Sequence, residues 1–346
     1  MANEVQRALW NDVVGDAWVR HVEYFDATLA SFGDAVIRRL DPAPGDRVLD
    51  IGCGVGTTTF DLAALVPPGE VVGVDLSARM LGEARRRAAA SELTNLRFVE
   101  ADVQTADLGE DSFDLAFSRC GVMFYPDPVA AFSNIARALI PGGHLGFVCF
   151  ASPMANPFIV APVMAAAAVL ELPPPPGPGE PSPFSLAEPD QTTALLESAG
   201  LTDVEIEPGP DEAVLYGATD IGPLAERVLE QNPGTAGRLA AVDPSVRAAA
   251  IRAAAEVLAE HREDDVVRMG AGTWIVTPRR NYPELSSPAV APSRGPDPAG
   301  TFGRRRPAPG GRTRMPGGGA RSRGHGTHPA LPPAPTAGRT RLPDAS

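Results

Sequence analysis

The sequence predicts an α/β protein built on a doubly wound, mostly parallel sheet of seven strands. Short apolar runs alternate with segments of helical periodicity between residues 47 and 150, which is the pattern of successive strand–helix–strand units. Glycines follow the first run, and an acidic residue lies at the end of each of the first three runs. Because parallel strands end at one edge of a sheet, we expect these residues to meet there.

The expected strands are short and apolar, at 47–51, 71–75, 96–100, 113–118, 145–150, 203–207 and 273–277. The expected helices between and after them carry apolar residues at helical spacing, at 57–66, 77–91, 128–139, 191–199, 221–230 and 244–261. Ser77 is the expected N-cap of its helix. Pro141-Gly142-Gly143 is expected to turn the chain into the fifth strand.

Four segments are expected along the chain. Residues 1–45 form a helical cap, with one or two amphipathic helices expected from Asp16 to Leu40, and 46–150 form the ligand-binding core of the sheet. Residues 151–282 add the last two strands and a helical insertion with a proline-rich loop, which we interpret as a lid over the sheet. In 283–346, 24 of 64 residues are proline or glycine, so this tail is expected to be disordered.

Composition excludes several function classes. Lysine is absent, which removes the Walker lysine, the pyridoxal Schiff base and the tyrosine–lysine pair of short-chain dehydrogenases. The net charge is −13. Residues 283–346 hold ten arginines against Glu284, Asp297 and Asp344, which leaves 1–282 at −20, so no nucleic-acid partner is expected.

Cysteine usage and hydropathy indicate a cytoplasmic protein without a metal. Three cysteines stand apart from one another, so neither a zinc site nor a disulfide framework is expected. The N-terminus has no signal-peptide pattern. The most apolar later stretch, 157–172, is too short to span a membrane.

The segment from Val48 to Thr58 carries three glycines between a strand and a helix, the geometry that lets a backbone approach a ligand closely. A dinucleotide fingerprint would place its third glycine at Thr57, whereas the third glycine here is Gly56. Asp50, in the strand, would repel a pyrophosphate but can accept a hydrogen bond from an ammonium group, directly or through water. The residues therefore favour a positively charged ligand.

This D-x-G-x-G-x-G loop resembles the first motif of class I S-adenosylmethionine-dependent methyltransferases. Residues 47–150 as a whole resemble the group related to ubiquinone and menaquinone C-methyltransferases. The matching stretches are the glycine loop, Ser112 to Pro128 and Leu139 to Gly143, with Ala155 to Phe158 and Trp274 to Thr277 resembling a bacterial subgroup. The resemblance implies a Rossmann-like fold, S-adenosylmethionine as cofactor, S-adenosylhomocysteine as product and a small-molecule methyl acceptor.

The cofactor-binding candidates lie at the ends of the first four strands. Asp75 is expected to accept hydrogen bonds from both ribose hydroxyls, and Asp102 one from the adenine amino group, with Val103 offering its backbone N–H. The full set is Asp50, Gly52, Cys53, Gly54, Gly56, Thr57, Asp75, Leu76, Asp102, Val103 and Ser118.

No catalytic triad is found, and the catalytic residue is left open. His21, Tyr24 and Arg119 are candidates, each weighed against a simpler role on a solvated helix face or in a loop. Trp10, Trp18, Phe124 and Tyr125 form either an aromatic wall for an apolar substrate or part of the core, and no catalytic role is assigned to them.

The acceptor atom is also left open among oxygen, nitrogen and carbon, in a quinone-like, phenolic or secondary-metabolite molecule. Two other functions are kept as alternatives. One is an NAD(P)-dependent oxidoreductase on a related sheet, motivated by Gly52 and Gly54. The other is a module that binds the cofactor without catalysis, motivated by the lack of an evident base.

Overall fold

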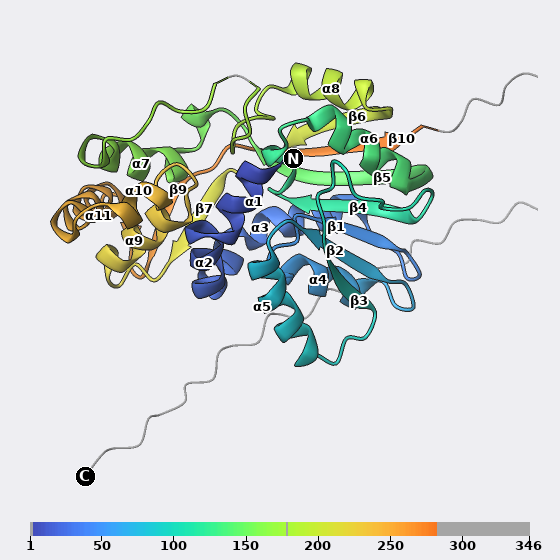
Figure 1. The fold of residues 1–346 in the computed structure, drawn as a ribbon, viewed down its shortest axis with the longest axis horizontal. Coiled ribbons are helices and arrows are strands. Elements are labelled where there is room, and N and C mark those ends of the chain that lie inside the picture. The colour runs from blue at the N-terminus through green and yellow to red at the C-terminus, as the bar shows by residue number, and fades with distance from the viewer. Residues whose placement is uncertain (1–2, 178, 282–346) are drawn as a thin grey trace, which may run out of the picture. The chain divides into compact units, whose positions relative to one another are not determined.

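A seven-stranded sheet forms the centre of the fold, in the order β3-β2-β1-β4-β5-β10-β6 (Figure 1). The computed structural model describes residues 3–177 and 179–281. The strands are β1 Val48–Ile51, β2 Val71–Asp75, β3 Leu96–Glu100, β4 Phe113–Arg119, β5 Leu139–Phe150, β6 Leu201–Pro208 and β10 Thr273–Arg280. Only β10 runs antiparallel to its neighbours in this sheet. The predicted seven-stranded, mostly parallel sheet is confirmed.

Helices cover both faces of this sheet. Those of the core are α3 Val22–Leu40, α4 Thr57–Leu65, α5 Ala78–Ala89, α6 Pro128–Ala138 and α8 Pro189–Ser198. Helices α3, α4 and α5 lie on one face, and α6 packs with α8 on the other (Figure 1). Because both faces are covered, β1 and β2 are buried at every position, which explains their continuous apolar runs.

The N-cap of α5 shows how the sequence sets a helix start. The Ser77 hydroxyl accepts a hydrogen bond from the backbone N–H of Met80 at 3.1 Å, as predicted for this helix. The side chain of Asp127 caps α6 in the same way, through the N–H of Ala130 at 3.0 Å. Both helices therefore begin immediately after loops that follow a strand end.

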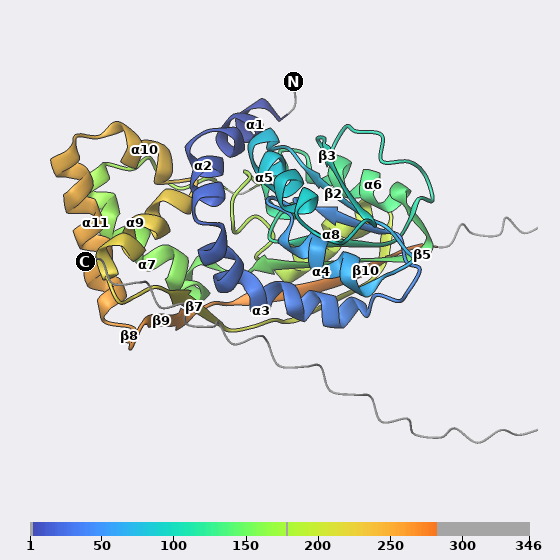
Figure 2. The same cartoon turned by 90° about the horizontal axis from the view of Figure 1, so that it is seen from below.

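The N-terminal region holds three helices, of which two cover the stretch 16–40 where one or two were expected, and one precedes it. They are α1 Glu4–Asn11, α2 Val13–Arg20 and the long α3. The breaks fall at Asp12 and His21, whose backbones leave the helical conformation. Helix α3 packs on β4 and β5, while α1 and α2 contact α5 and reach toward the C-terminal helices (Figure 2).

The expected turn at Pro141-Gly142-Gly143 is wrong in detail. These residues lie inside β5, whose pairing with β4 shifts register between Phe113–Leu139 and Leu115–His144. Gly142 has a φ of 80°, so the chain makes an irregularity within the ladder rather than a turn before it.

Residues 151–281 contain more helices and strands than were expected. They hold the helices α7 Pro157–Leu170, α9 Ile221–Gln231, α10 Ala236–Ala241 and α11 Pro244–Ala259. They also hold a second, three-stranded antiparallel sheet that the sequence analysis missed, made of β7 Glu212–Tyr216, β9 Val266–Gly270 and β8 Arg262–Glu263. These elements gather at one end of the main sheet (Figure 2).

The expected apolar helix and proline-rich loop after β5 are present as α7 and residues 171–188, where residue 178 is outside the described ranges. The predicted disordered tail, 283–346, also lies outside the described residues. None of the described helices is long and apolar enough to cross a membrane.

Candidate functional site

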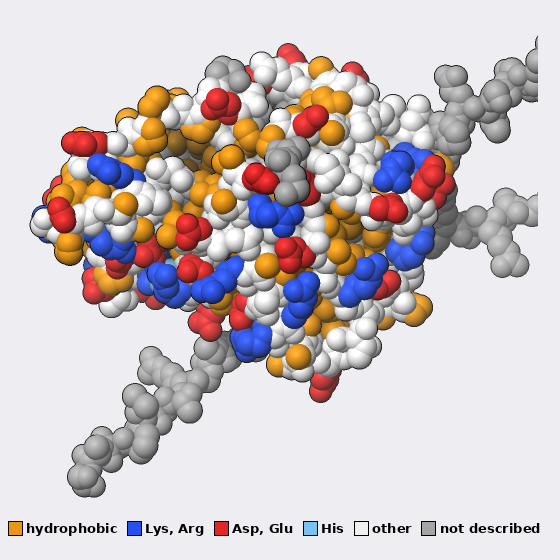
Figure 3. Space-filling view, in the orientation of Figure 1, with side chains coloured by type: hydrophobic (Ala, Val, Ile, Leu, Met, Phe, Trp, Pro, Cys, Tyr) orange, Lys and Arg blue, Asp and Glu red, His pale blue; other side chains and the backbone are white. Residues whose placement is uncertain are grey.

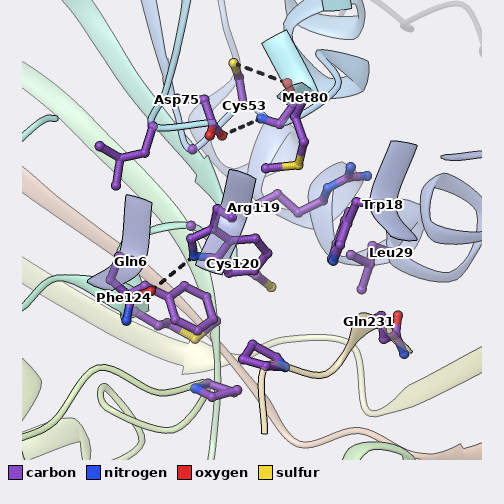
Figure 4. A pocket seen from close by; sticks show the side chains of 18 of the residues that line it. Gln6, Trp18, Leu29, Cys53, Asp75, Met80, Arg119, Cys120, Phe124 and Gln231 are labelled. Carbon is purple, nitrogen blue, oxygen red and sulfur yellow. Dashed lines mark hydrogen bonds between the residues drawn. The ribbon is translucent and has the colours of Figure 1, made fainter. Parts of the chain in front are cut away.

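A cavity lies where the carboxyl ends of β1, β2 and β4 meet the N-terminal and C-terminal helices (Figure 4). The centre of a water molecule could move through about 190 Å³ of it. Its floor is the glycine loop after β1. Its walls come from α1, α2, α3, α7 and the loop after α9. The lining includes seven predicted site residues, namely Gly52, Cys53, Gly54, Asp75, Leu76, Val103 and Arg119.

The glycine loop can be built only with glycine at two of its positions. Gly52 has a φ of 67°, and a Cβ there would lie 2.9 Å from the Cα of Gly121. Gly56 has a φ of 86° at the N-cap of α4, and its Cβ would lie 2.6 Å from the ring of Phe98. Gly54, with a φ of 55°, faces the cavity beside Met80.

Asp75 fixes this loop from the neighbouring strand. One carboxylate oxygen accepts the backbone N–H of Gly54 at 2.8 Å, and the other accepts that of Ser77 at 2.8 Å. Burial raises the pKa of Asp75, while backbone hydrogen bonds from Ser77, Gly54 and Leu76 oppose that shift. The carboxylate therefore points at the cavity in one fixed orientation.

Asp50 lies beneath the loop rather than on the cavity surface. One of its carboxylate oxygens accepts the hydroxyls of Thr58 at 2.9 Å and Thr59 at 2.6 Å. The other is buried and has no hydrogen-bond partner among the described residues. Burial raises the pKa of Asp50 to about 6, with the two threonines and Arg119 opposing the shift. An unsatisfied buried acceptor at this depth favours a donor that comes with a ligand or water.

Asp102 also stands behind the cavity surface. Its carboxylate accepts the backbone and side-chain N–H groups of Gln104, at 3.0 and 3.2 Å, which shapes the turn after β3. The next residue, Val103, lines the cavity, and within the described chain its backbone N–H donates to no other group. The turn thus presents one free backbone donor to a ligand.

Three other predicted residues support the loop instead of lining the cavity. The hydroxyl of Ser118 is fully buried, donates to the carbonyl of Ile51 at 2.8 Å and accepts the N–H of Gly121 at 3.2 Å. Thr57 donates to Asp26 of α3 at 2.6 Å, and Gly56 is the N-cap of α4. The side chains of Ser118 and Thr57 hold β4 and α3 against the loop.

Arg119 is the cation of the cavity wall (Figure 4). Its side chain is 11% exposed and makes one hydrogen bond within the described chain, to Asp26 at 3.4 Å. Asp26 is shared with Thr57 and with Arg87 of α5, whose guanidinium lies 3.5 Å away. Most of the N–H donors of Arg119 therefore remain for a ligand.

His21 and Tyr24, two of the three residues weighed as catalytic candidates, do not line this cavity. His21 breaks the chain between α2 and α3, and its ring lies 3.4 Å from the carboxylate of Glu230. Tyr24 is buried against Phe25, with the guanidinium of Arg227 5.1 Å from its ring centre. Both side chains meet residues of α9, His21 through Glu230 and Tyr24 through Arg227.

Aromatic side chains form the wall opposite Asp75. Trp10 and Phe124 meet edge to face with ring centres 5.2 Å apart, and Trp18 stacks on Phe25 at 4.4 Å. Trp10, Trp18, Phe124 and Tyr125 all line the cavity, which favours the aromatic-wall interpretation that was left open.

Sequence analysis missed the lining residues that come from distant segments. They are Gln6, Leu29, Phe150, Phe158, Ile159, Pro183, Val228, Gln231, Asn232 and Pro233. Gln231 is the last residue of α9, and Asn232 and Pro233 follow it in the next loop. No local pattern marks these three residues as a site. Their place depends on how α9 packs against α2.

Comparison with known proteins decides the family. A family model described as a methyltransferase domain matches residues 48–143. Aklanonic acid methyltransferase DauC of Streptomyces sp. (strain C5) is 34% identical over 148 residues, which cover 41% of this chain and 67% of that protein. The chain belongs to the S-adenosylmethionine-dependent methyltransferases.

A mycobacterial protein is also similar to this methyltransferase. An uncharacterized protein of Mycobacterium tuberculosis is 33% identical over 142 residues, 41% of this chain and 48% of that protein. The match thus spans two thirds of the Streptomyces relative and about half of the mycobacterial one. The narrower likeness to ubiquinone and menaquinone enzymes stays a prediction.

A solved structure supports the fold of this methyltransferase. A Haemonchus contortus phosphoethanolamine N-methyltransferase, in complex with phosphomonomethylethanolamine and S-adenosylhomocysteine, superposes with a TM-score of 0.50 at 19% identity. The match covers 79% of this chain and 60% of that one. The shared feature is the fold around the sheet.

Proposed function

We propose that this methyltransferase moves the methyl group of S-adenosylmethionine to a small, largely apolar acceptor. The observation that carries the proposal is the continuity of one cavity. Its floor holds the glycine loop, Asp75 and the free N–H of Val103, and its walls are aromatic and aliphatic. A polar nucleoside and an apolar second molecule therefore fit side by side.

The floor supplies the polar contacts of the nucleoside. Asp75, oriented by Gly54 and Ser77, is proposed to accept from the ribose hydroxyls, since each of its oxygens keeps a second lone pair. Val103 is proposed to donate its backbone N–H to the adenine ring, and Leu76 to line the same region. Asp102 would act mainly by shaping the turn that presents Val103.

Asp50 is proposed to hold the ammonium group of the methionine part through a water molecule. It does not line the cavity, so a bridging water fits better than direct contact. Its unpaired buried oxygen supplies the acceptor, and Thr58 and Thr59 fix its direction. Cys53 and Gly56 contribute the backbone of the loop.

The acceptor half of the cavity is apolar. Phe150, Phe158, Ile159 and Val228 contribute hydrocarbon surface, and Gln231 adds an amide. Hydrophobic side chains also gather around α7 on the molecular face of Figure 3. The name of the Streptomyces relative, a methyltransferase for aklanonic acid, supports a small-molecule acceptor for this chain.

A bound sulfonium donor supplies an electrophilic methyl group, which is the chemistry the chain itself lacks. The residues of the cavity contribute binding, orientation and exclusion of water. Orientation alone can lower a barrier by several kcal/mol, so no covalent nucleophile is needed.

Titration calorimetry with S-adenosylmethionine and S-adenosylhomocysteine tests this function. We expect both to bind with one site per chain. Mass spectrometry of acceptors incubated with the protein and the donor then tests transfer, by the gain of a methyl group. No heat with either nucleoside would disprove cofactor binding, and binding without transfer would support the non-catalytic module.

A further inference from the structure

The cavity contains few groups that can exchange a proton. Within the described chain, its charged lining residues are Asp75 and Arg119, and its other titratable ones are Cys53, Cys120 and Tyr125. No histidine or glutamate from the described residues is among them. The acceptor half therefore lacks the side chains that usually act as general bases.

None of the titratable lining groups is suited to accept a proton from a substrate near neutral pH. Both oxygens of Asp75 already accept backbone N–H groups, and this carboxylate faces the nucleoside side. Burial raises the pKa of Cys120 to about 12 and also raises the pKa values of Cys53 and Tyr125, so all three stay protonated. The described residues that line the cavity therefore supply no general base.

Arg119 places a positive charge in the cavity wall, where it can bind an anionic group of the acceptor. It lines the cavity at the end of β4, is largely buried, and spends one donor on the long contact with Asp26. A guanidinium has five N–H groups in a planar fork that fits a carboxylate. An anionic group of the acceptor would find its partner there.

We infer that the acceptor is an apolar carboxylic acid, methylated on its carboxylate oxygen, and that Arg119 positions that carboxylate. The inference rests on the proposed function and names its substrate class. Carboxylic acids are ionised at neutral pH, with pKa values near 4, whereas phenols and amines hold their protons to about pH 10. A carboxylate is thus the common acceptor that needs no base.

The step balances without a proton. One carboxylate oxygen forms a bond to the methyl carbon, the carbon–sulfur bond breaks, and its electron pair stays on sulfur. The positively charged sulfonium and the negatively charged carboxylate become a neutral thioether and a neutral methyl ester. The apolar walls favour this loss of charge, because charged groups are costly to keep in such surroundings.

The first test is binding, which needs no turnover. Titration calorimetry compares 2-naphthoate with 2-naphthalenemethanol, which has the same ring body but no charge, on the protein saturated with S-adenosylhomocysteine. We expect the acid to bind about tenfold more tightly or better, and Arg119→Gln to remove that preference. Arg119→Lys, which keeps the charge, should retain part of it.

The second test is the product. With S-adenosylmethionine, 2-naphthoate should become its methyl ester, which alkali cleaves, at a kcat/KM that stays flat from about pH 7 to about pH 9, above the pKa of Asp50. The alcohol should remain unmethylated. Methylation of the alcohol, equal binding of acid and alcohol, or no ester from the acid would each overturn the inference.

The two proposals fail in different ways. If S-adenosylhomocysteine does not bind, the proposed function itself is wrong. If it binds, and Arg119→Gln weakens its binding as strongly as it weakens that of the acid, then Arg119 serves the methionine carboxylate and the assignment to the acceptor is overturned. Unchanged nucleoside affinity in Arg119→Gln supports the assignment.

Discussion

The carboxylate of Asp75, at the end of β2, accepts the backbone N–H of Gly54 in the loop after β1 at 2.8 Å. The acidic residue and the glycine loop are therefore one unit before any ligand binds. Its second oxygen accepts the N–H of Ser77, which starts α5. The loop, the strand end and the helix start are held in register by a single side chain.

Replacing Asp75 with alanine should weaken binding of S-adenosylmethionine by about 1.5 to 3 kcal/mol, about 10- to 150-fold in Kd, because charged hydrogen bonds to the ribose and the support of Gly54 are lost together. Calorimetry measures the change. Glu256→Ala, an exposed acid on α11, is the control and should bind normally. An unchanged Kd for the Asp75 variant would contradict its assignment.

Gly52→Ala should lower the free energy of unfolding by about 1 to 3 kcal/mol, because Gly52 has a positive φ and its new Cβ would meet Gly121. Gly82→Ala is the matched control, since Gly82 lies within α5 with no atom within 4 Å of an added Cβ. That control should gain about 0.5 to 1 kcal/mol. Chemical denaturation of both variants checks the difference, and equal effects would argue against a strained loop.

Asp50 should make stability depend on pH in the mildly acidic range. Its pKa is raised from 3.8 to about 6 in the folded protein, so folding favours its protonated form. The stability that this group adds is complete below about pH 4 and is lost as the pH rises to about 6. The loss, at most about 3 kcal/mol, should be absent from Asp50→Asn. Denaturation curves at several pH values give the comparison, and parallel curves for the two proteins would refute it.

Glu230 should hold the N-terminal helices against the cavity. Its carboxylate lies 3.0 Å from Arg20 and 3.4 Å from His21 of the α2–α3 region, and 2.8 Å from Arg247 of α11. Glu230→Gln should weaken stability by about 1 kcal/mol and raise the Kd for S-adenosylmethionine. Glu226→Gln, which loses a contact with Arg247 but none with α2, should affect the Kd less. The reverse order would show that α2 is held by other contacts.

The sequence predicts the sheet core because its signals are local. Val71 to Asp75 reads as a strand since both of its faces are buried, and the glycines near Gly52 mark a loop that other residues cannot form. The same locality explains the correct N-cap at Ser77. Each of these features is decided within about one turn or strand of chain.

The remaining features depend on contacts between distant segments. β7 and β9 are five residues each and pair with one another across fifty residues, so neither carries a strong pattern alone. Gln231 reaches the cavity only because α9 packs against α2. His21 was considered for catalysis from its residue type, but its partner Glu230 lies 209 positions away. Tertiary packing therefore decides which of the predicted residues line the cavity.

The position of β10 between β5 and β6 has a consequence for synthesis. β6 pairs with β10 and with no other described strand, yet β10 comes 65 residues later in sequence, after all the described helices. During translation, an early sheet of β3, β2, β1, β4 and β5 can assemble while β6 waits with both edges bare. Until β10 is made, the edges of β5 and β6 that it pairs with in the finished sheet stay unpaired, and such edges invite aggregation.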